Sequence, residues 1–272
     1  MRVSRRAARG PPVFVKAFRE MPADGLFAAE AEGLRALREL GGAATPEVVC
    51  AGRDVPVLSV LEARPAREDF WERLAHTLAR LHTTTVHDRF GWSRDNWLGH
   101  CRQDNTCDTD GHTFFARSRL LRWLPEPRVR AALDERDQRA LERLCERLPE
   151  LLPSRPACLT HGDLWAHNIL ATRDGQPALI DPAVSYMWPE VDLAHLWSSP
   201  HPPEAKRFFA RYAELTGLRR RLARQDADHP VAAALGRHRP VRARLGCGGP
   251  GPCHAQAVPF VGHCHVVGRG GV

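Results

Sequence analysis

The sequence predicts an α+β protein of two lobes, a small β-rich lobe over residues 1–64 and a larger, mainly helical lobe over residues 65–217. Short runs of apolar and β-branched residues dominate the first part, whereas apolar residues at helical spacing dominate the second. A third segment, residues 218–272, has no helical periodicity and is rich in Arg, Gly, Pro, His and Cys. Such a composition predicts an irregular tail.

The small lobe opens with a strand that we expect from Pro12 to Phe18 and that carries Lys16. A helix should follow, with Asp24 as its N-cap and with Glu30 on its apolar stripe. A carboxylate on an apolar face is costly unless it is paired, and Lys16 is the nearest attractive partner. The chain has 37 arginines and only two lysines. Because Arg serves most surface roles equally well, a lysine kept in a strand indicates a chemical role.

Two further strands, at residues 48–50 and 55–61, complete the small lobe. The segment from Glu62 to Pro65 is the predicted connection to the large lobe, because Pro65 ends the strand. In the large lobe the patterns predict helices at 69–82, 114–124, 129–148, 191–197 and 204–215, and strands at 157–160, 169–172 and 178–180. Residues 90–111 are rich in Asn, Asp, Gly and Cys and predict one long loop.

The charge of the chain is unevenly distributed. Nine arginines and only two acids, Asp226 and Asp228, follow Gly217, so the net charge of +7 resides in the tail and the body is neutral. We therefore expect no nucleic-acid partner, with an arginine-rich binding tail as a minor alternative. No run of about 18 apolar residues occurs, and the charged start has no apolar stretch behind it. We expect a cytoplasmic protein without a membrane span.

The eight cysteines show no repeated close spacing in the body of the chain. In a cytoplasmic protein they are expected to be reduced structural thiols. A zinc site in the tail is a weaker alternative, because its candidate ligands match no common zinc spacing. Those candidates are Cys247, Cys253, His254, His263, Cys264 and His265.

The motif HGDLWAHN at residues 161–168, followed by IDP at 180–182, predicts a site for phosphoryl transfer. This reaction needs a carboxylate to orient or deprotonate the attacking hydroxyl, oxygen ligands for Mg²⁺ and a cation on the nucleotide phosphates. Asp163 and Asn168 have the spacing of the catalytic Asp and the metal-binding Asn of protein kinases. Asp181 follows the next apolar strand and is placed to bind a second metal ion. Each residue alone is commonly a turn or cap residue, but the ordered combination is specific.

With these motifs the chain resembles the fructosamine kinase family, relatives of the aminoglycoside phosphotransferases within the protein-kinase-like fold. The matching stretches are VFVK at 13–16, FAAEAEGL at 27–34, FGW at 90–92, DNWLG at 95–99, QDN at 103–105, FF at 114–115, RL at 119–120, HGDLWAHN at 161–168, IDPA at 180–183 and EVDLA at 190–194. The loop motif that contains Asn96 and Gln103 favours this family over antibiotic kinases.

The resemblance implies ATP-dependent phosphorylation of a sugar hydroxyl in ketosamines, the free or protein-bound products of glycation of amines. It implies a catalytic base (Asp163), Mg²⁺ ligands (Asn168, Asp181), residues of the nucleotide site (Lys16, Glu30, Glu62), substrate contacts (Trp165, Asn96, Gln103) and residues that support the catalytic loop (His161, Asp192). A structural role for Trp165 beneath the loop remains open.

The chain departs from the family at both ends. The residues before Val13 are too few for the hairpin that covers the ATP phosphates in the family, so we expect a truncated N-terminal lid. The tail after Gly217 lacks the expected helices, and a shifted reading frame or a divergent tail would explain its composition. Two alternatives to an active ketosamine kinase therefore remain: a kinase for aminoglycosides or other small hydroxyl compounds, and an inactive remnant of the fold.

Overall fold

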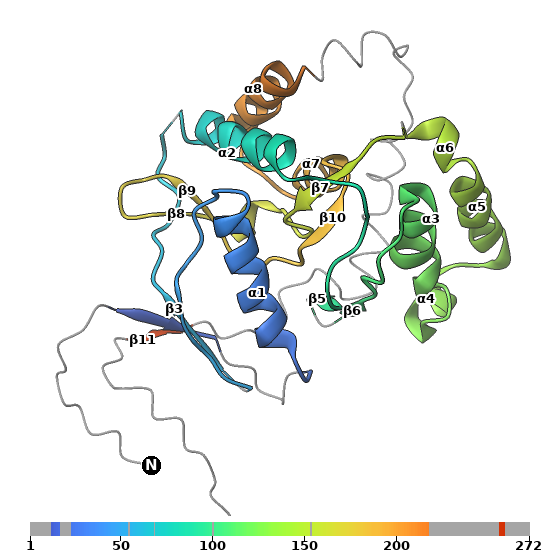
Figure 1. The fold of residues 1–272 in the computed structure, drawn as a ribbon, viewed down its shortest axis with the longest axis horizontal. Coiled ribbons are helices and arrows are strands. Elements are labelled where there is room, and N and C mark those ends of the chain that lie inside the picture. Colours follow the sequence, from blue (N-terminus) through green and yellow to red (C-terminus); the bar gives the residue numbers. More distant parts are fainter. Residues whose placement is uncertain are drawn as a thin grey trace, which may run out of the picture.

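Figure 1 shows the computed structural model, which describes residues 12–16, 23–53, 55–67, 69–99, 101–152 and 154–217, together with the backbone of 256–258. The small lobe has one antiparallel sheet with the strand order β11-β1-β3-β2. Its strands are β1 (Val13–Val15), β2 (Val48–Ala51), β3 (Pro56–Ser59) and β11 (Gln256–Val258). The helix α1 (Leu26–Glu39) lies between this sheet and the large lobe (Figure 1).

The start of α1 differs from the prediction. Gly25, with φ of 82°, precedes the helix, and no side chain caps its first turn. Asp24 is therefore not the N-cap; its carboxylate instead lies 3.4 Å from the guanidinium of Arg53. Glycine takes this left-handed conformation without the steric cost that a Cβ atom brings. The predicted burial of Glu30 on the apolar face of the helix is confirmed.

The large lobe is mainly helical, as predicted. Its helices are α2 (Phe70–Thr84), α3 (Gly111–Phe115), α4 (Pro127–Ala132), α5 (Glu135–Glu146), α6 (Leu148–Leu151), α7 (Glu190–Ser198) and α8 (Lys206–Thr216). A three-stranded sheet has the order β10-β7-β4, with β4 (Val86–His87), β7 (Ala157–Thr160) and β10 (Ser185–Met187). Two hairpins complete it: β5 (Asn96–Leu98) with β6 (Cys101–Gln103), and β8 (Ile169–Ala171) with β9 (Pro177–Leu179).

Three predicted segments differ from the observed ones. The expected loop 90–111 contains the hairpin β5–β6. The expected helix 114–124 begins earlier, at Gly111, and continues after Phe115 as a π-helical and then a 3₁₀ turn. The expected helix 129–148 is interrupted at Leu133, whose extended backbone lets the Asp134 side chain accept a hydrogen bond from the Asp137 N–H and cap α5. Local capping thus overrides a continuous apolar pattern.

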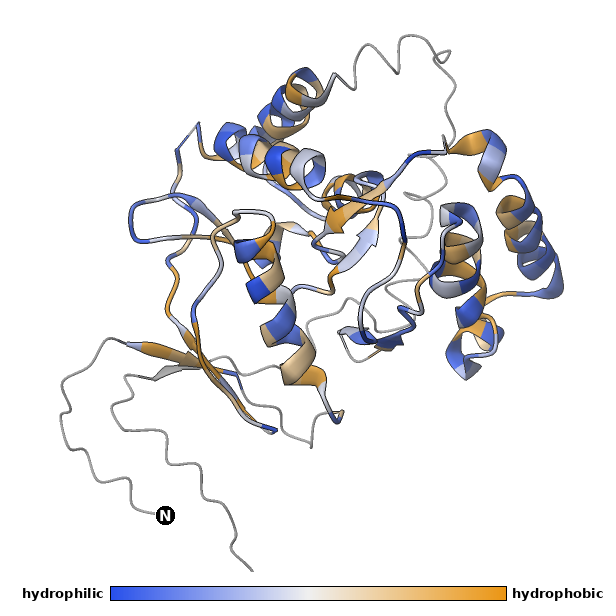
Figure 2. Cartoon of the chain, in the orientation of Figure 1, coloured by the Kyte–Doolittle hydropathy of each residue, from blue (hydrophilic) through white to orange (hydrophobic). Residues whose placement is uncertain are grey.

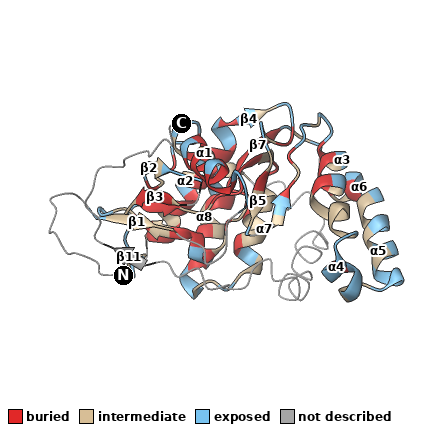
Figure 3. Ribbon diagram, turned by 90° about the horizontal axis from the view of Figure 1, so that it is seen from below, coloured by how far each residue is buried: buried red, intermediate tan, exposed pale blue. Residues whose placement is uncertain are grey.

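The main core lies where α2 and α8 pack together over the strands that carry the predicted catalytic motifs (Figures 1 and 2). Its fully buried members include Leu74, Leu78, Leu159, Ile169 and Phe208. A second cluster joins α3 to the segment around Trp188. Figure 3 shows the buried residues concentrated in the centre, whereas α4 and α5 lie at the periphery and are largely exposed or half-buried. The motif strands are therefore rigidly supported.

Two backbone contacts join the lobes. The backbone of Glu62 exchanges hydrogen bonds with Ala171 on β8, at N···O distances of 2.7 and 2.9 Å. The N–H of Leu179 on β9 donates to the carbonyl of Ala44 at 2.9 Å. The hairpin β8–β9, which connects the two halves of the catalytic motif, therefore lies directly against the small lobe.

Most of the tail, residues 218–255 and 259–272, falls outside the described residues, as do the suggested zinc ligands and arginine-rich binding segment. The strand β11 is the exception, and the sequence did not predict it. It pairs with the outer edge of β1, with Val13 opposite Val258 and Val15 opposite Gln256. Within the described part of the chain, no helix has the length and apolar character needed to cross a membrane.

Gly111 provides a test of the packing in the second cluster. A Cβ atom at this position would lie against the Phe90 ring and 2.6 Å from the Trp188 ring. We expect Gly111→Ala to lower the free energy of unfolding by about 1–3 kcal/mol, because overpacking forces both rings to move. Urea denaturation would measure it. Gly52→Ala is the control, because its Cβ would contact only the Val55 carbonyl, at 3.3 Å; equal effects of both substitutions would contradict the assignment.

Candidate active site

Lys16 stands at the centre of the small-lobe part of the site. Its Nζ atom lies 3.0 Å from Glu30 Oε2 on α1 and 3.0 Å from Asp181 Oδ1 just after β9. The predicted Lys16–Glu30 pair is therefore present, and Asp181 joins it. Residues from three separate segments of the chain meet at one ammonium group.

The electrostatics of this cluster follow from two carboxylates that share one cation. Burial raises the pKa of Glu30 to about 7, against the lowering effect of Lys16. Burial opposes the charge of Asp181 as well, but Lys16 outweighs it and holds the pKa of Asp181 below its usual range. Burial disfavours the charged form of Lys16, yet Asp181 and Glu30 raise the pKa of Lys16 above its usual value. Lys16 and Asp181 are thus charged at neutral pH.

We expect a pH-dependent stability that comes from Glu30. As the pH rises from 4.5 to about 7, the unfolded chain ionises Glu30 while the folded chain keeps its proton, so the folded state loses stability over this window. The shift in pKa corresponds to a loss on the order of 3 kcal/mol. Urea denaturation at several pH values would show this slope in the wild-type chain and its absence in Glu30→Gln. The same slope in both proteins would refute the assignment.

The catalytic motif follows β7 and forms a compact loop. The Asn168 amide donates to the Asp163 carbonyl at 3.0 Å and lies 3.4 Å from Asp163 Oδ2. The Ile180 N–H donates to the Asn168 carbonyl at 3.1 Å, which places Asp181 beside this loop. The structure thus brings Asp163, Asn168 and Asp181 to one place, in the arrangement that their order in the sequence predicts.

His161 holds this loop as a neutral ring, as its bonding partners show. Its Nε2 atom lies 2.9 Å from the Ile180 carbonyl, which can only accept, and its Nδ1 atom accepts from the Asp163 N–H at 3.2 Å. The proton therefore resides on Nε2. Gly162, with φ of 81°, packs so closely on Ala183 that a Cβ atom would overlap the Ala183 carbonyl. Only glycine fits there.

A buried carboxylate anchors the start of the loop to the helices. Asp192 on α7 is fully buried and accepts hydrogen bonds from the backbone N–H groups of His161 at 2.8 Å and Gly162 at 2.9 Å. His82 on α2 lies 3.2 Å from Asp192 through Nε2 and 2.8 Å from the Tyr212 hydroxyl through Nδ1. Burial alone would raise the pKa of Asp192, but the hydrogen bonds that it accepts from His82 and from the His161 N–H hold that pKa below its usual range.

Asp192→Asn tests this anchor. One carbonyl oxygen cannot replace two carboxylate oxygens that serve three donors, and the new NH₂ group would face a donor. We expect a loss of about 3 kcal/mol in the free energy of unfolding, together with a larger drop in kcat than change in KM. Urea denaturation and steady-state kinetics would measure both, with the exposed Glu204→Gln on the same lobe as control. Wild-type stability in Asp192→Asn would contradict the anchoring role.

His195 is a neighbour of the predicted base that the sequence analysis missed. Its Nδ1 atom lies 3.8 Å from Asp163 Oδ1. His195 follows Asp192 by three residues on α7, so both side chains reach the loop from one face of the helix. That spacing is the signal that could have identified it. His82 and Tyr212, in contrast, carry no local signal, because they lie on α2 and α8.

The predicted substrate residues occupy two different environments. Trp165 is half-buried beside the loop, with its ring 4.6 Å from that of the exposed His167, so a contact with substrate stays a prediction. Asn96 and Gln103 are paired across the β5–β6 hairpin and are both buried. The Asn96 amide donates to the Val184 carbonyl at 2.7 Å. Asn96 thus supports the segment after Asp181, and a contact of Asn96 or Gln103 with a sugar stays a prediction.

Glu62, a predicted residue of the nucleotide site, has an exposed side chain, and its backbone is bonded to Ala171. The neighbouring Arg64 donates to the Ala166 carbonyl of the catalytic loop and lies over the Trp71 ring, 5.5 Å from its centroid. The connection between the lobes is therefore tied to the catalytic loop. A role of Glu62 toward nucleotide stays a prediction.

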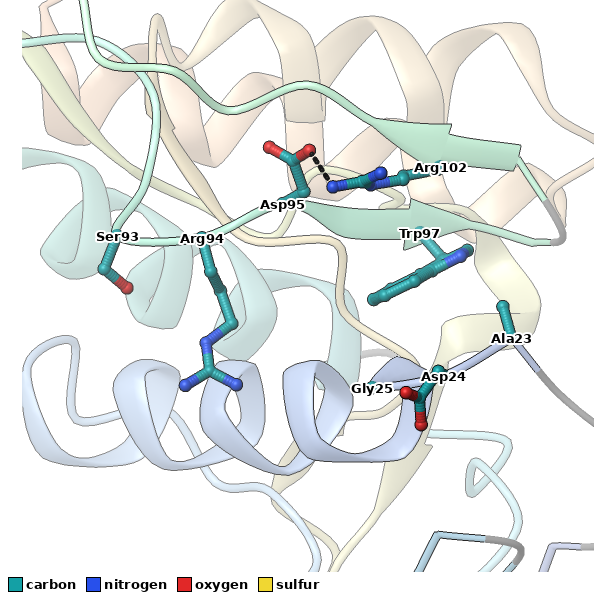
Figure 4. A pocket seen from close by; sticks show the side chains of 8 residues that line it. All are labelled: Ala23, Asp24, Gly25, Ser93, Arg94, Asp95, Trp97 and Arg102. Carbon is teal, nitrogen blue, oxygen red and sulfur yellow. Dashed lines mark ion pairs between the residues drawn. The ribbon is translucent and has the colours of Figure 1, made fainter.

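A cavity of about 830 Å³ lies between the start of α1 and the β5–β6 hairpin, and none of the predicted site residues lines it (Figure 4). Its lining residues are Ala23, Asp24, Gly25, Ser93, Arg94, Asp95, Trp97 and Arg102. Two guanidiniums in its wall are already paired, Arg102 with Asp95 at 2.9 Å and Arg94 with Glu32 at 2.8 Å. The chemistry of the motif residues, and not the size of this cavity, therefore locates the candidate active site.

The residues around Asp181 fit a magnesium ion. The Asp181 carboxylate is 43% exposed although its backbone is held in the left-handed region, at φ of 52°, and Asn168 supplies an amide oxygen from the adjoining loop. Mg²⁺ binds proteins through such oxygen donors and keeps several waters. No cluster of three or more His, Cys, Asp and Glu residues suited to a metal occurs among the described residues, and an Asn–Asp pair for a phosphate-bound ion requires none.

Comparison with known proteins agrees with this geometry. The sequence model of the fructosamine kinase family matches residues 3–226. The chain belongs to the fructosamine kinase family. A "Probable ketoamine kinase" of Synechocystis is 35% identical over 173 residues, which are 62% of this chain and 58% of the relative. Another, of Thermus thermophilus, is 34% identical over 206 residues, covering 74% of this chain and 71% of the relative.

Solved structures of this family and its neighbours show the same fold. The crystal structure of a Thermobifida fusca protein, described as a "putative fructosamine-3-kinase", superposes with a TM-score of 0.73 at 31% identity, covering 87% of this chain and 80% of that one. An ADP-bound aminoglycoside phosphotransferase has a TM-score of 0.50 at 15% identity, covering 83% and 74%. The predicted two-lobed protein-kinase-like fold is thus confirmed. The chain spans only about 56–61% of the length of the first three curated relatives.

Proposed function

We propose that this member of the fructosamine kinase family transfers the γ-phosphate of ATP to a sugar hydroxyl of a ketosamine. The observation that carries the proposal is the convergence of Lys16, Asp163, Asn168 and Asp181 at the junction of the two lobes. Relatives at about one-third identity are named as ketoamine kinases, and a rice chloroplast relative, 29% identical, is named as a protein-ribulosamine 3-kinase. Free and protein-bound ketosamines are therefore both candidate substrates.

The residues of the site divide the work of phosphoryl transfer. Asp163 accepts the proton of the attacking sugar hydroxyl, so that a new oxygen–phosphorus bond forms as the bond to the leaving ADP breaks. His195, 3.8 Å from Asp163 Oδ1, borders this base. Asn168 and Asp181 would hold Mg²⁺, which neutralises the charge that develops on the phosphate oxygens. Lys16 offers its ammonium to the nucleotide phosphates, and Glu30 keeps it in place.

The remaining predicted contacts are proposed as follows. Trp165 offers an apolar ring face on which a sugar can stack. Glu62 lies on the connection between the lobes, beside the β8–β9 hairpin, and we place it at the border of the nucleotide site. Asn96 supports the site from behind through its bond to the Val184 carbonyl, and Gln103 lies opposite Asn96 across the β5–β6 hairpin.

Incubation of the chain with ATP, Mg²⁺ and a fructosyl-amine tests the activity directly. We expect phosphorylated sugar and ADP in equal amounts, and a loss of about 10²- to 10⁴-fold in kcat for Asp163→Asn, because a positioned base contributes that much. Ribulosamines and an aminoglycoside belong in the same panel. Turnover of the antibiotic without turnover of ketosamines would replace the proposed substrate class.

Nucleotide-induced thermal stabilisation separates an active enzyme from an inactive remnant. A ligand at a hundred times its dissociation constant adds about 2.7 kcal/mol to the stability of the folded state. The wild-type chain should therefore melt higher with Mg²⁺ and ATP, and Lys16→Met should lose most of that shift. Absence of both stabilisation and phosphate transfer in the wild-type chain would favour the remnant.

A further inference from the structure

Glu32 on α1 is the acceptor for three consecutive residues of the large lobe. The Trp92 indole N–H donates to Glu32 Oε1 at 2.8 Å, the Ser93 hydroxyl donates to the same oxygen at 2.9 Å, and Arg94 Nε lies 2.8 Å from Oε2. Figure 4 shows the Arg94 side chain extended toward α1. We call Glu32, Trp92, Ser93 and Arg94 the α1 clamp. It uses both oxygens of one carboxylate and fixes the helix to the segment that precedes β5.

Residues 92–96 also bond to the chain that follows Asp181. Asn96, two residues after Arg94, donates to the Val184 carbonyl at 2.7 Å. On the other side, α1 packs onto this stretch at Gly33, where a Cβ atom would come within 3.0 Å of Pro182 and 3.4 Å of Val184. Residues 92–96 therefore connect α1 with the segment that carries Asp181.

These contacts close a ring with the Lys16 cluster. Lys16 bonds both Glu30 and Asp181, and Glu30 lies on the same helix as Glu32. The α1 clamp holds the segment that ends at Asn96, the first residue of β5. Asn96 in turn bonds the chain three residues after Asp181. Residues two apart on a helix point about 200° away from each other. Glu30 therefore faces Lys16 while Glu32 faces the large lobe. Because both lie on α1, a rotation of the helix at Glu32 also moves Glu30.

We propose that Glu32 is a positioning residue for phosphoryl transfer: through the α1 clamp it fixes the rotation and height of α1 and so sets Glu30 against Lys16 and Asp181. The proposal rests on the proposed function, because Lys16 and Asp181 matter as nucleotide and metal contacts only in a kinase. In this fold the Lys–Glu pair must be in place for transfer. Loss of the clamp removes three bonds that resist rotation of α1, so that Glu30 is set less firmly against Lys16 and Lys16 depends more on Asp181.

A purely structural clamp would act differently. Glu32 is 28% exposed and Arg94 54% exposed, and a partly exposed ion pair by itself contributes little to stability. A structural role would lower the melting temperature without a specific effect on nucleotide. The positioning role instead predicts weaker binding of nucleotide by a protein that remains folded.

Calorimetric titration of the full chain with a non-hydrolysable ATP analogue and Mg²⁺ distinguishes the two roles. We expect Glu32→Gln to raise the Kd by about tenfold, within the range of measured coupling between linked sites. Glu39→Gln is the matched control, since it removes an exposed carboxylate from the last turn of α1 and should leave the Kd unchanged. Equal Kd values for Glu32→Gln and wild type would overturn the proposal.

A double-mutant cycle tests whether Glu32 acts through Glu30. If it does, the Glu30→Gln/Glu32→Gln double variant should bind nucleotide no more weakly than Glu30→Gln alone, because the first substitution already removes the Lys16–Glu30 ion pair. Additive losses would show that Glu32 acts independently of the pair and would contradict the proposal.

The Trp92 indole N–H resonance gives a readout that needs neither turnover nor nucleotide. It reports on the bond to Glu32, and Trp92→Phe identifies it among the signals of the seven tryptophans. Coupling through α1 predicts that Glu30→Gln shifts this resonance and that Glu39→Gln does not. If the wild-type chain binds no nucleotide, the proposed function fails, and this resonance still decides whether α1 couples Glu32 to Glu30. An unshifted signal in Glu30→Gln would refute that coupling and with it the positioning role.

Discussion

The ammonium group of Lys16, 3.0 Å from both Glu30 and Asp181, joins three segments that lie far apart in the sequence. It lies at the end of β1, so its position depends on the small-lobe sheet. Glu30 depends on the packing of α1, and Asp181 on the β8–β9 hairpin. Because a buried carboxylate or ammonium left unpaired is strongly unfavourable, this contact constrains the sheet, the helix and the hairpin at once.

In the large lobe, too, a buried carboxylate joins segments that lie far apart in the sequence. The loop of Asp163 begins with two buried N–H groups, and Asp192 satisfies both while His82 and Tyr212 satisfy Asp192. Such a network is favourable only when every member is bonded. Helices α2, α7 and α8 thus determine where the predicted catalytic loop begins. His161 links this loop to the segment of Asp181 through its hydrogen bond to the Ile180 carbonyl.

A strand that the sequence did not predict covers the outer edge of β1. Members of the family carry a hairpin over the ATP phosphates, and for this chain we expect that lid to be truncated. In the structure that edge is paired with β11, a strand from the C-terminal segment. An exposed strand edge presents unpaired backbone groups to any partner, and β11 satisfies them at the position next to Lys16.

The sequence by itself predicted the residues on which the proposed chemistry depends. It identified the Lys16–Glu30 pair, the Asp163–Asn168 spacing and Asp181 after a strand, because short-range motifs and apolar periodicity are local properties of the chain.

Only the tertiary structure decided which buried polar residues support these side chains. The hairpin β5–β6 lies in a stretch whose content of Asn, Asp, Gly and Cys predicts a loop, and the buried Asn96 there bonds the Val184 carbonyl, far away in the sequence. His82 bonds Asp192, and Trp92 bonds Glu32, although each pair lies far apart in the sequence. No local sequence pattern reveals such pairs. A buried polar side chain is specified by its partner, and the fold alone brings the two together.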